Sequence, residues 1–346
     1  MNFELLKKLC NFFAASGDED NLRSFVLEEI KDYVEDVKID ALGNLIAKKR
    51  GTEKKEIEKK FLLTSHMDEV GFIVTHVTSE GFLKFSTVGS INSKILLGTR
   101  VLVGGKRILG VIGSTPIHLL KSEEKFKDVS IEDMYIDVGA KNKEDALEYV
   151  NLGDYAYFEP VFFEDENNIR SKALDNRLGC FILINLIKRS YPYDVYFAFT
   201  TREEIGAIGA KTMAYSLNPE ISIVVDSTTA SDIHGIDEDD KVCMLEKGPV
   251  VPFMDLGTVY NKKLYSLAFR LANENKIPIQ TKEAVAGGTD ASVIHNVKCG
   301  VKTLGVSVPC RYIHSPVGLC KKVDLKNTEK LLESLILKIL ENAESI

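Results

Sequence analysis

Residues 194–204 read DVYFAFTTREE, an almost uninterrupted apolar stretch that closes on two adjacent glutamates. Residues 61–68 (FLLTSHMD) and 221–226 (ISIVVD) repeat this arrangement, and each ends in acidic or histidine side chains. Such near-continuous aromatic and β-branched runs are typical of strands buried on both faces, which belong to sheets covered by helices. The segments between them carry apolar residues at helical spacing. We therefore predict an α/β fold in which a mixed sheet is covered by helices on both faces.

Residues 69–164 have a different texture from the rest of the chain. Short β-like pieces such as GFIVTHV and RVLVGG are separated by glycines, and a helical pattern occurs only near residues 143–150. This pattern predicts a small β-barrel-like domain inserted at 69–164. The flanking segments, 1–68 and 165–346, then form the main α/β domain together.

The composition argues against several classes of protein. Of 346 residues, 44 are Lys or Arg and 51 are Asp or Glu, so the formal net charge is −7. An acidic chain is not expected to bind nucleic acid or an anionic membrane, because phosphate binding needs an excess of basic residues on one face. The six cysteines form no CxxC pair, and the N-terminal residues lack the apolar stretch of a signal peptide. We expect a soluble, cytoplasmic protein with reduced thiols.

The chemistry is expected where the buried strands end, because ligands of open α/β sheets bind beyond the carboxyl ends of the strands. Acidic and histidine side chains follow these strands or open the next helix: His66, Asp68, Asp175, Glu203, Glu204, Asp226 and His314. Carboxylates gathered at one sheet edge repel one another unless a cation lies among them. Such donors suit Zn²⁺ or a similar first-row ion, and a carboxylate shared between two ions gives a two-metal hydrolytic centre.

The adjacent pair Glu203-Glu204 divides into two roles in such a centre. One carboxylate can bind a metal ion, while its neighbour points elsewhere and stays free to take a proton from water. Asp68 lies two residues after His66, so its carboxylate can orient the imidazole. Without these partners, a pair of acids at this position would be interpreted as the exposed start of a helix.

Six motifs in order carry a family resemblance: HMDEVGFIV, SKALDNRLGC, TTREEIGAIGA, VVDSTTA, AGGTDAS and RYIHS. The set resembles the M42 family of co-catalytic metallo-aminopeptidases, which includes glutamyl and tetrahedral aminopeptidases and some members labelled endoglucanase. The resemblance runs from about residue 16 to the terminal helix. It implies a zinc-exopeptidase-like fold that removes N-terminal residues from peptides, and assembly through the β-insert into a homo-oligomer, from a dimer to a dodecamer.

The resemblance also implies a metal site. Two divalent ions, Zn or Co, are expected to be held by five residues: His66, Asp175, Glu204, Asp226 and His314. His66 and Asp226 would ligate the first ion, Asp175 would bridge the two, and the remaining pair would complete the second. The native metal stays open, because Zn²⁺, Co²⁺ and Mn²⁺ all accept these donors.

Further roles are implied for residues beside the metal ligands. Glu203 is expected to be the general base toward a metal-activated water, and Asp68 is expected to hold His66 in place. Gly288, Thr289 and Asp290 are expected along the substrate cleft, with helix capping as the alternative role of Asp290.

Two stretches depart from the pattern of similar proteins. Arg202 precedes the two glutamates where Gln is common, and residues 232–235 (DIHG) replace a Thr-Pro-Gly turn. Substrate preference is therefore open, with Arg202 giving a slight hint toward acidic residues. His234 is interpreted either as a structural residue or as a pocket residue or extra ligand. His76, His118 and His295 are expected to be structural.

Other functions remain as alternatives. The chain could be a metal-poor or inactive family member that acts as an oligomeric peptide-binding shell, or a metal-dependent hydrolase of another amide or of glucan. A glycosidase needs two carboxyl groups about 5–10 Å apart across a sugar and has no need for two histidines. The sequence contains no GxSxG, HExxH or Walker A motif.

Overall fold

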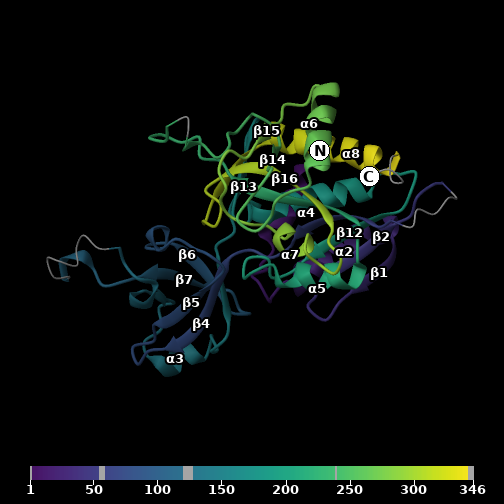
Figure 1. Cartoon of the computed structure of the whole chain (residues 1–346). Coiled ribbons are helices and arrows are strands. Elements are labelled where there is room, and N and C mark those ends of the chain that lie inside the picture. The colour runs from purple at the N-terminus through teal and green to yellow at the C-terminus, as the bar shows by residue number, and fades with distance from the viewer. Residues whose placement is uncertain (1, 54–58, 120–127, 238–239, 342–346) are drawn as a thin grey trace.

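The computed structural model describes residues 2–53, 59–119, 128–237 and 240–341. Figure 1 shows an α/β body built on one large mixed sheet and a smaller β barrel that projects from it. The barrel strands are consecutive in the chain, from β4 to β9, whereas the large sheet draws on segments before and after them. The predicted mixed sheet and the predicted inserted barrel are both present.

The large sheet has parallel strands at its centre. Its path is β1 (Glu35–Ile39), β2 (Leu45–Lys49), β12 (Val195–Thr200), β3 (Phe61–His66), β13 (Ile221–Thr229), β16 (Lys302–Arg311), β17 (Gly318–Lys321), β11 (Asn168–Ser171) and β10 (Phe162–Glu164), with β14 (Val250–Val251) and β15 (Gln280–Thr281) beside β16. The neighbours β12, β3, β13 and β16 run parallel to one another. Their carboxyl ends therefore meet at one edge of the sheet.

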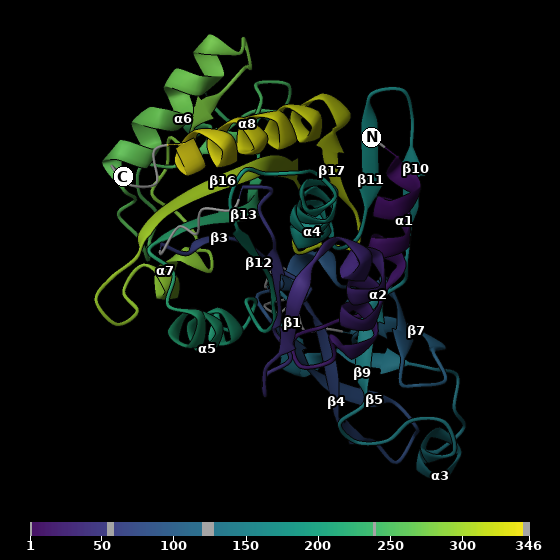
Figure 2. The same ribbon diagram turned by 90° about the vertical axis from the view of Figure 1, so that its right-hand side faces the viewer.

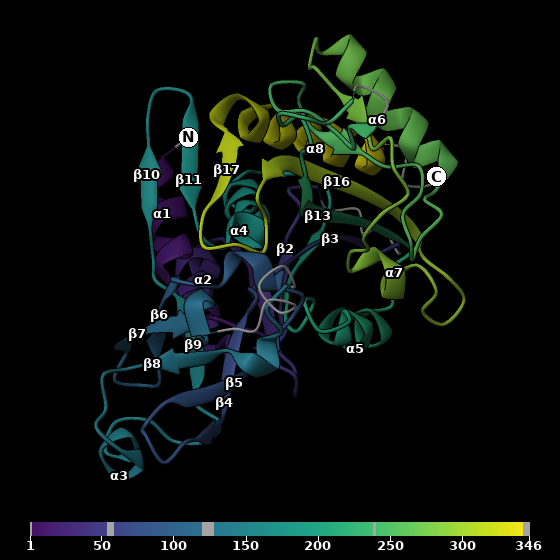
Figure 3. The same cartoon turned by 90° about the vertical axis from the view of Figure 1, so that its left-hand side faces the viewer.

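Helices cover both faces of this sheet, as Figures 2 and 3 show. One face carries α1 (Phe3–Asn11), α2 (Asp20–Ile30), α4 (Leu174–Ile187), α6 (Lys262–Glu274) and α8 (Lys322–Glu341), and the other carries α5 (Ile208–Leu217) and α7 (Ala291–Ile294). Successive strand residues point to opposite faces. Leu63 and Val225 accordingly pack in the core with α4, whereas Leu62 and Val224 pack in the core with α5.

The barrel closes on itself and has its own core. Its order is β4 (Gly71–Val77), β5 (Leu83–Val88), β8 (Tyr135–Asp137), β7 (Ile108–Gly113), β6 (Arg100–Val103) and β9 (Tyr155–Phe158). Phe72 packs edge-on against Phe85 and Phe158, with ring centroids 5.3 and 5.2 Å apart. Closure leaves no free strand edge on this small unit.

Short helices complete the described structure. They are α3 (Lys143–Leu147) and the 3₁₀ turns at Lys31–Tyr33, Ser93–Ile95, Ile117–Leu119 and Ile131–Asp133. Within the described residues, no helix is both long enough and apolar enough to span a bilayer.

Candidate metal centre

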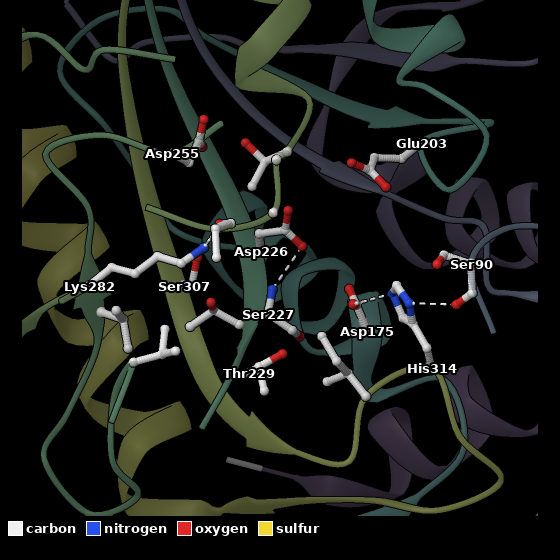
Figure 4. Close-up of a pocket in the computed structure, with 18 of the residues that line it drawn as sticks. Ser90, Asp175, Glu203, Asp226, Ser227, Thr229, Asp255, Lys282, Ser307 and His314 are labelled. Carbon is white, nitrogen blue, oxygen red and sulfur yellow. Dashed lines mark hydrogen bonds and ion pairs between the residues drawn. The ribbon is translucent and has the colours of Figure 1, made fainter. Parts of the chain in front are cut away.

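The predicted site residues meet at the edge where the parallel strands end. His66 is the last residue of β3 and pairs in register with Thr200 of β12. Asp226 lies on the neighbouring strand β13, and Glu203 follows β12. His314 comes from the turn after β16, and Figure 4 shows it next to Asp175. Adjacent parallel strands thus gather residues that are far apart in the sequence.

Asp175 reaches the same edge from the start of α4. This helix packs closely on the sheet at Gly179, where an added Cβ would lie 2.3 Å from Ser65 Oγ and 2.8 Å from the Val225 carbonyl oxygen. Asn176 fixes the same contact, because its Nδ2 donates a hydrogen bond of 2.9 Å to that carbonyl. The missing side chain at position 179 therefore lets the helix start approach the strand ends.

Asp175 lies between the two histidines. Its Oδ1 is 3.3 Å from His66 Nε2, and its Oδ2 is 3.3 Å from His314 Nε2. Asp226 Oδ1 is 3.4 Å from His66 Nε2, and Glu204 Oε2 is 3.2 Å from His314 Nε2. One carboxylate therefore belongs to two donor groups, each with its own histidine and its own second acid.

These groups have the composition and spacing of metal ligands. In His66–Asp175–Asp226 and in Asp175–Glu204–His314, donor atoms lie within 4.8 Å of one another, and His66 forms a third such group with Glu203 and Glu204. Glu204 Oε1 is buried and has no hydrogen-bond partner among the described residues. Imidazole and carboxylate are the donors that Zn²⁺ and similar ions accept. The residues present therefore fit divalent cations.

The pKa shifts of the cluster also favour a bound cation. Burial raises the pKa of Glu204 to about 7, because a carboxylate removed from water is less stable in its charged form. Burial opposes the charged form of His314, but Asp175 and Glu204 outweigh it and raise the pKa of that imidazole to about 11. His66 likewise has a raised pKa, because Asp175 and Asp226 outweigh its burial. Without a metal ion, protons on the histidines neutralise the acids.

Asp68 connects His66 to the glutamate turn. It is fully buried, its Oδ1 lies 3.4 Å from His66 Nδ1, and its carbonyl oxygen lies 3.1 Å from the same nitrogen. The carboxylate also accepts hydrogen bonds from the backbone N–H groups of Glu203 (3.0 Å) and Glu204 (3.1 Å) and from Ser16 Oγ (2.6 Å). Asp68 thus fixes both the ring and the two glutamates.

Glu203 lines the cavity beside the donor groups. Within the described residues its carboxylate accepts no hydrogen bond, although its backbone N–H is held by Asp68. Burial raises the pKa of Glu203 well above the usual range, and the nearby Asp226 and Asp290 add to this effect. In Figure 4 the carboxylate stands apart from Asp175 and His314 at the rim of the same cavity. Glu203 therefore binds a proton more readily than an exposed glutamate, and no hydrogen bond from the described residues holds its carboxylate.

The predicted cleft residues are distributed between the cavity wall and the interior. The cavity has a volume of about 580 Å³, and Gly288 and Thr289 line it. Asp290 is buried, is not among the lining residues and accepts a hydrogen bond of 2.5 Å from Thr200 Oγ1. Asp290 occupies the N-cap position of α7, as the capping alternative expects, but its side chain makes no capping hydrogen bond to that helix.

The two departures from the family pattern lie outside the cavity wall. Neither Arg202 nor His234 is a lining residue, and His234 is exposed and belongs to none of the donor groups found in the described chain. Asp232 instead anchors its segment, because Arg311 donates to its Oδ1 (2.8 Å) and to its carbonyl oxygen (2.7 Å). The segment 232–235 is therefore tied to the end of β16, just before His314.

Two features of the site have no counterpart in the motifs. His314 Nδ1 lies 2.9 Å from the backbone carbonyl oxygen of Ser90, which follows the barrel strand β5. Lys282, just after β15, reaches into the cavity from the side opposite His314 (Figure 4). A backbone acceptor leaves no trace in side-chain patterns, and a lone lysine after a short strand is ordinarily exposed to solvent.

The chain is similar to known proteins over nearly its whole length. A model of the M42 glutamyl aminopeptidase family matches residues 43–331. The lysyl aminopeptidase of Pyrococcus furiosus is 32% identical over 346 residues, covering 97% of each chain.

The chain also superposes on solved structures over nearly its whole length. The TET aminopeptidase from the marine sediment archaeon Thaumarchaeota archaeon SCGC AB-539-E09 superposes with a TM-score of 0.94 at 34% identity, covering 99% of this chain and 98% of that one. The Pyrococcus horikoshii TET1 peptidase, described as assembling into a tetrahedron or a large octahedral shell, superposes with a TM-score of 0.84 at 36% identity, covering 97% and 99%.

Proposed function

Because this chain belongs to the M42 glutamyl aminopeptidase family, we propose that it is a metal-dependent aminopeptidase that removes N-terminal residues from peptides. The observation that carries the proposal is the position of Asp175, whose two oxygens face His66 and His314 at 3.3 Å each. A carboxylate shared in this way suits two neighbouring divalent ions.

The two ions, Zn²⁺ or Co²⁺, would be held by five side chains. His66 and Asp226 would ligate one, Glu204 and His314 the other, and Asp175 both. When bound, such ions supply Lewis acidity that polarises the scissile carbonyl and makes water more acidic.

Glu203 would carry the proton in this reaction. Its carboxylate takes one proton from the attacking water and later gives it to the nitrogen of the leaving amine, so it returns to its starting state. The raised pKa caused by burial makes it a suitable acceptor and donor. Its backbone is held by Asp68, so the carboxylate stays close to the donor groups while it remains free to move the proton.

The barrel would serve assembly rather than chemistry. We propose that residues 69–164 form an oligomerisation domain, except for β10 (Phe162–Glu164), which lies in the large sheet, and that 1–68 with 165–346 form the catalytic domain. Leu109 and Val111 of β7 are exposed apolar residues on the outside of the barrel, 51% and 41% accessible. This surface suits contact with another copy, in assemblies from a dimer to a dodecamer. All six cysteines are unpaired thiols, which supports a cytoplasmic location.

The experiment uses protein that has been stripped with a chelator and reloaded with Zn²⁺, Co²⁺ or Mn²⁺. Bound metal is measured by elemental analysis, and hydrolysis is measured on a panel of aminoacyl p-nitroanilides with free amines and on the same amides with acetylated amines. We expect turnover of the free-amine series only, and only after reloading. Release of p-nitroaniline from the acetylated series would contradict a requirement for a free amine, and release of acetate from that series would favour a deacylase instead.

The same experiment separates the enzyme from a peptide-binding shell. A shell would bind peptide without stoichiometric metal and without turnover. Family membership does not fix which N-terminal residue is released, since the family takes its name from glutamyl substrates and the relative from Pyrococcus furiosus from lysyl ones.

A further inference from the structure

Residues 201–207, which lead from β12 to α5 and include Glu203, form the glutamate turn. Its own backbone satisfies one side of this turn, since the Glu203 carbonyl oxygen accepts hydrogen bonds of 2.9 Å from the N–H groups of Gly206 and Ala207. The first four N–H groups, at residues 201–204, instead donate to side chains. These side chains therefore decide how the start of the turn is held.

The four N–H groups have three buried acceptors. Asn44 Oδ1 accepts a hydrogen bond of 3.0 Å from the Thr201 N–H. Glu19 Oε1 accepts one of 3.1 Å from the Arg202 N–H. The carboxylate of Asp68 accepts from the next two N–H groups. Three segments that lie far apart in the sequence thus hold the backbone of one turn.

Glu19 is directed toward the glutamate turn rather than toward its own helix. It is the residue before α2, yet its side chain makes no capping hydrogen bond to that helix. Its Oε1 accepts a second hydrogen bond, of 2.9 Å, from the Gly17 N–H. Gly17 has a φ of 97°, and a Cβ there would lie 2.7 Å from the hydroxyl oxygen of Tyr155 on barrel strand β9. The loop before α2 therefore packs against the barrel and fixes the Glu19 oxygen.

An isolated carboxylate is unfavourable in this position. Glu19 is 3% exposed and forms no ion pair with the described residues. Burial raises the pKa of Glu19, the hydrogen bond from Gly17 opposes this shift, and the negative charge of Asp68 adds to it. A buried charge without a cationic partner destabilises the fold unless hydrogen bonds compensate for it. The contacts that compensate here include the Arg202 N–H of the glutamate turn.

Glu203 depends on the backbone of this turn for its position. Among the described residues, no hydrogen bond holds its carboxylate. The preceding residue, Arg202, has a φ of 58°, in the left-handed region that residues other than glycine rarely adopt. Such a conformation persists only where surrounding contacts maintain it. Without the acceptor on Glu19, the backbone at Arg202 can relax and carry the Glu203 side chain with it.

We propose that Glu19 is a positioning residue: by accepting the Arg202 N–H, it holds the glutamate turn so that the Glu203 carboxylate stays beside the donor groups. The assignment rests on the proposed function, in which Glu203 carries the proton. A Glu203 oxygen lies within 4.8 Å of donor atoms of His66 and Glu204. Displacement of a reacting group by about 1 Å can slow an enzyme roughly a hundredfold.

The first test separates the hydrogen bond of Glu19 from its charge. Glu19→Met keeps the length of the side chain and removes the acceptor. On a free-amine p-nitroanilide, we expect kcat of the metal-loaded protein to fall roughly ten- to hundredfold, with KM and bound metal unchanged. Glu19→Gln keeps an oxygen within reach of Arg202 and should recover most of this loss. Glu19→Asp keeps the charge but withdraws the acceptor by one methylene, so it should be impaired. Glu28→Met, the same substitution at an exposed position of α2, is the matched control.

A double-mutant cycle shows whether Glu19 acts through Glu203. In a Glu203→Gln background, the loss caused by Glu19→Met should shrink to less than about twofold, because no proton-accepting carboxylate is left to misplace. An equal loss in both backgrounds would indicate a general structural role and overturn the assignment. A Glu19→Gln variant as impaired as Glu19→Met would do the same, and so would a loss of bound metal in Glu19→Met.

Amide hydrogen exchange gives a readout that needs no activity. Mass spectrometry of peptides covering residues 200–207 should show faster exchange in Glu19→Met than in the wild type, with Glu19→Gln close to the wild type. If no p-nitroanilide is hydrolysed by the wild type, the proposed function fails, and exchange alone decides whether Glu19 holds the turn. Equal exchange in the wild type and Glu19→Met would contradict the assignment.

Discussion

The Nδ1 atom of His314 lies 2.9 Å from the backbone carbonyl oxygen of Ser90, a residue 224 positions earlier in the chain. A ring N–H that donates to this carbonyl leaves Nε2 directed at Asp175 and Glu204. Ser90 follows the last residue of barrel strand β5, so the inserted barrel contributes directly to the orientation of a proposed metal ligand.

Glu203→Gln should abolish most of the peptidase activity and leave metal binding intact. The amide cannot accept a proton from water, and general-base catalysis contributes about 10²- to 10⁴-fold to the rate. The measurement is kcat on a free-amine p-nitroanilide together with elemental analysis. Glu144→Gln, on the exposed barrel helix α3, is the control. Full activity of Glu203→Gln would remove Glu203 from the mechanism.

Asp175→Asn should reduce the occupancy of both metal positions, because both donor groups include Asp175. His314→Ala should reduce the occupancy of one position only, since His314 belongs to one group. Metal content per chain after dialysis against a fixed free concentration measures the difference. Asp165→Asn, in an exposed hairpin, should retain the full complement. Equal losses for Asp175→Asn and His314→Ala would argue against a bridging carboxylate.

Asp68→Ala should weaken both the metal centre and the fold around it. Three hydrogen bonds to the carboxylate are lost, two of them from the glutamate turn. Loss of such a supporting partner commonly costs 10- to 100-fold in metal affinity or activity. Ser16→Ala removes one of the three bonds and should have a smaller effect on kcat. A competition titration with a chromogenic chelator measures the affinity, and an unchanged value would contradict the role of Asp68.

Lys172→Met should destabilise the apo protein by about 3–5 kcal/mol, since it leaves buried Glu69 with a weaker set of partners. The lysine Nζ lies 2.7 Å from both oxygens of Glu69 and 2.9 Å from the Phe12 carbonyl oxygen. Lys188→Met breaks a pair with Glu29 that is about one third exposed, and should cost less than about 1 kcal/mol. Urea unfolding measures both losses in the free energy of unfolding. Similar losses for the two variants would contradict the greater contribution expected of the buried ion pair.

Leu109→Asp combined with Val111→Asp should reduce the size of the assembly without unfolding the chain. Both side chains point outward on β7, while Ile112, the next residue of the same strand, points into the barrel core. Light scattering after size exclusion measures the mass. Val37→Asp, an exposed position of β1, is the control. An unchanged mass would mean that the outer face of β7 does not form the assembly contact.

The gathering of residues at the strand ends could be predicted from the sequence. The packing of α4 on the sheet and the contacts from the barrel could not. His66 ends a buried apolar strand and Asp226 lies three residues before the end of another, and parallel neighbours bring such residues together. Asp175 could be placed by its motif only, because its position depends on how closely α4 packs on the sheet. The contact of Ser90 with His314 depends on how a barrel with its own core is placed against the large sheet, so that its backbone reaches the site. Asp290 was expected along the cleft and lies buried beneath it, which a motif alone cannot distinguish.

The position of Asp175 depends on the absence of a side chain at Gly179. Gly179 lies four residues after Asp175, about one helical turn, and methyl substitution would collide with Ser65 Oγ and push the start of α4 outward. Asp175 would then lie farther from His66 and His314, without any of the proposed ligands being altered. The geometry of the proposed metal centre could therefore be altered through the depth at which this helix packs on the sheet, rather than through the ligands themselves.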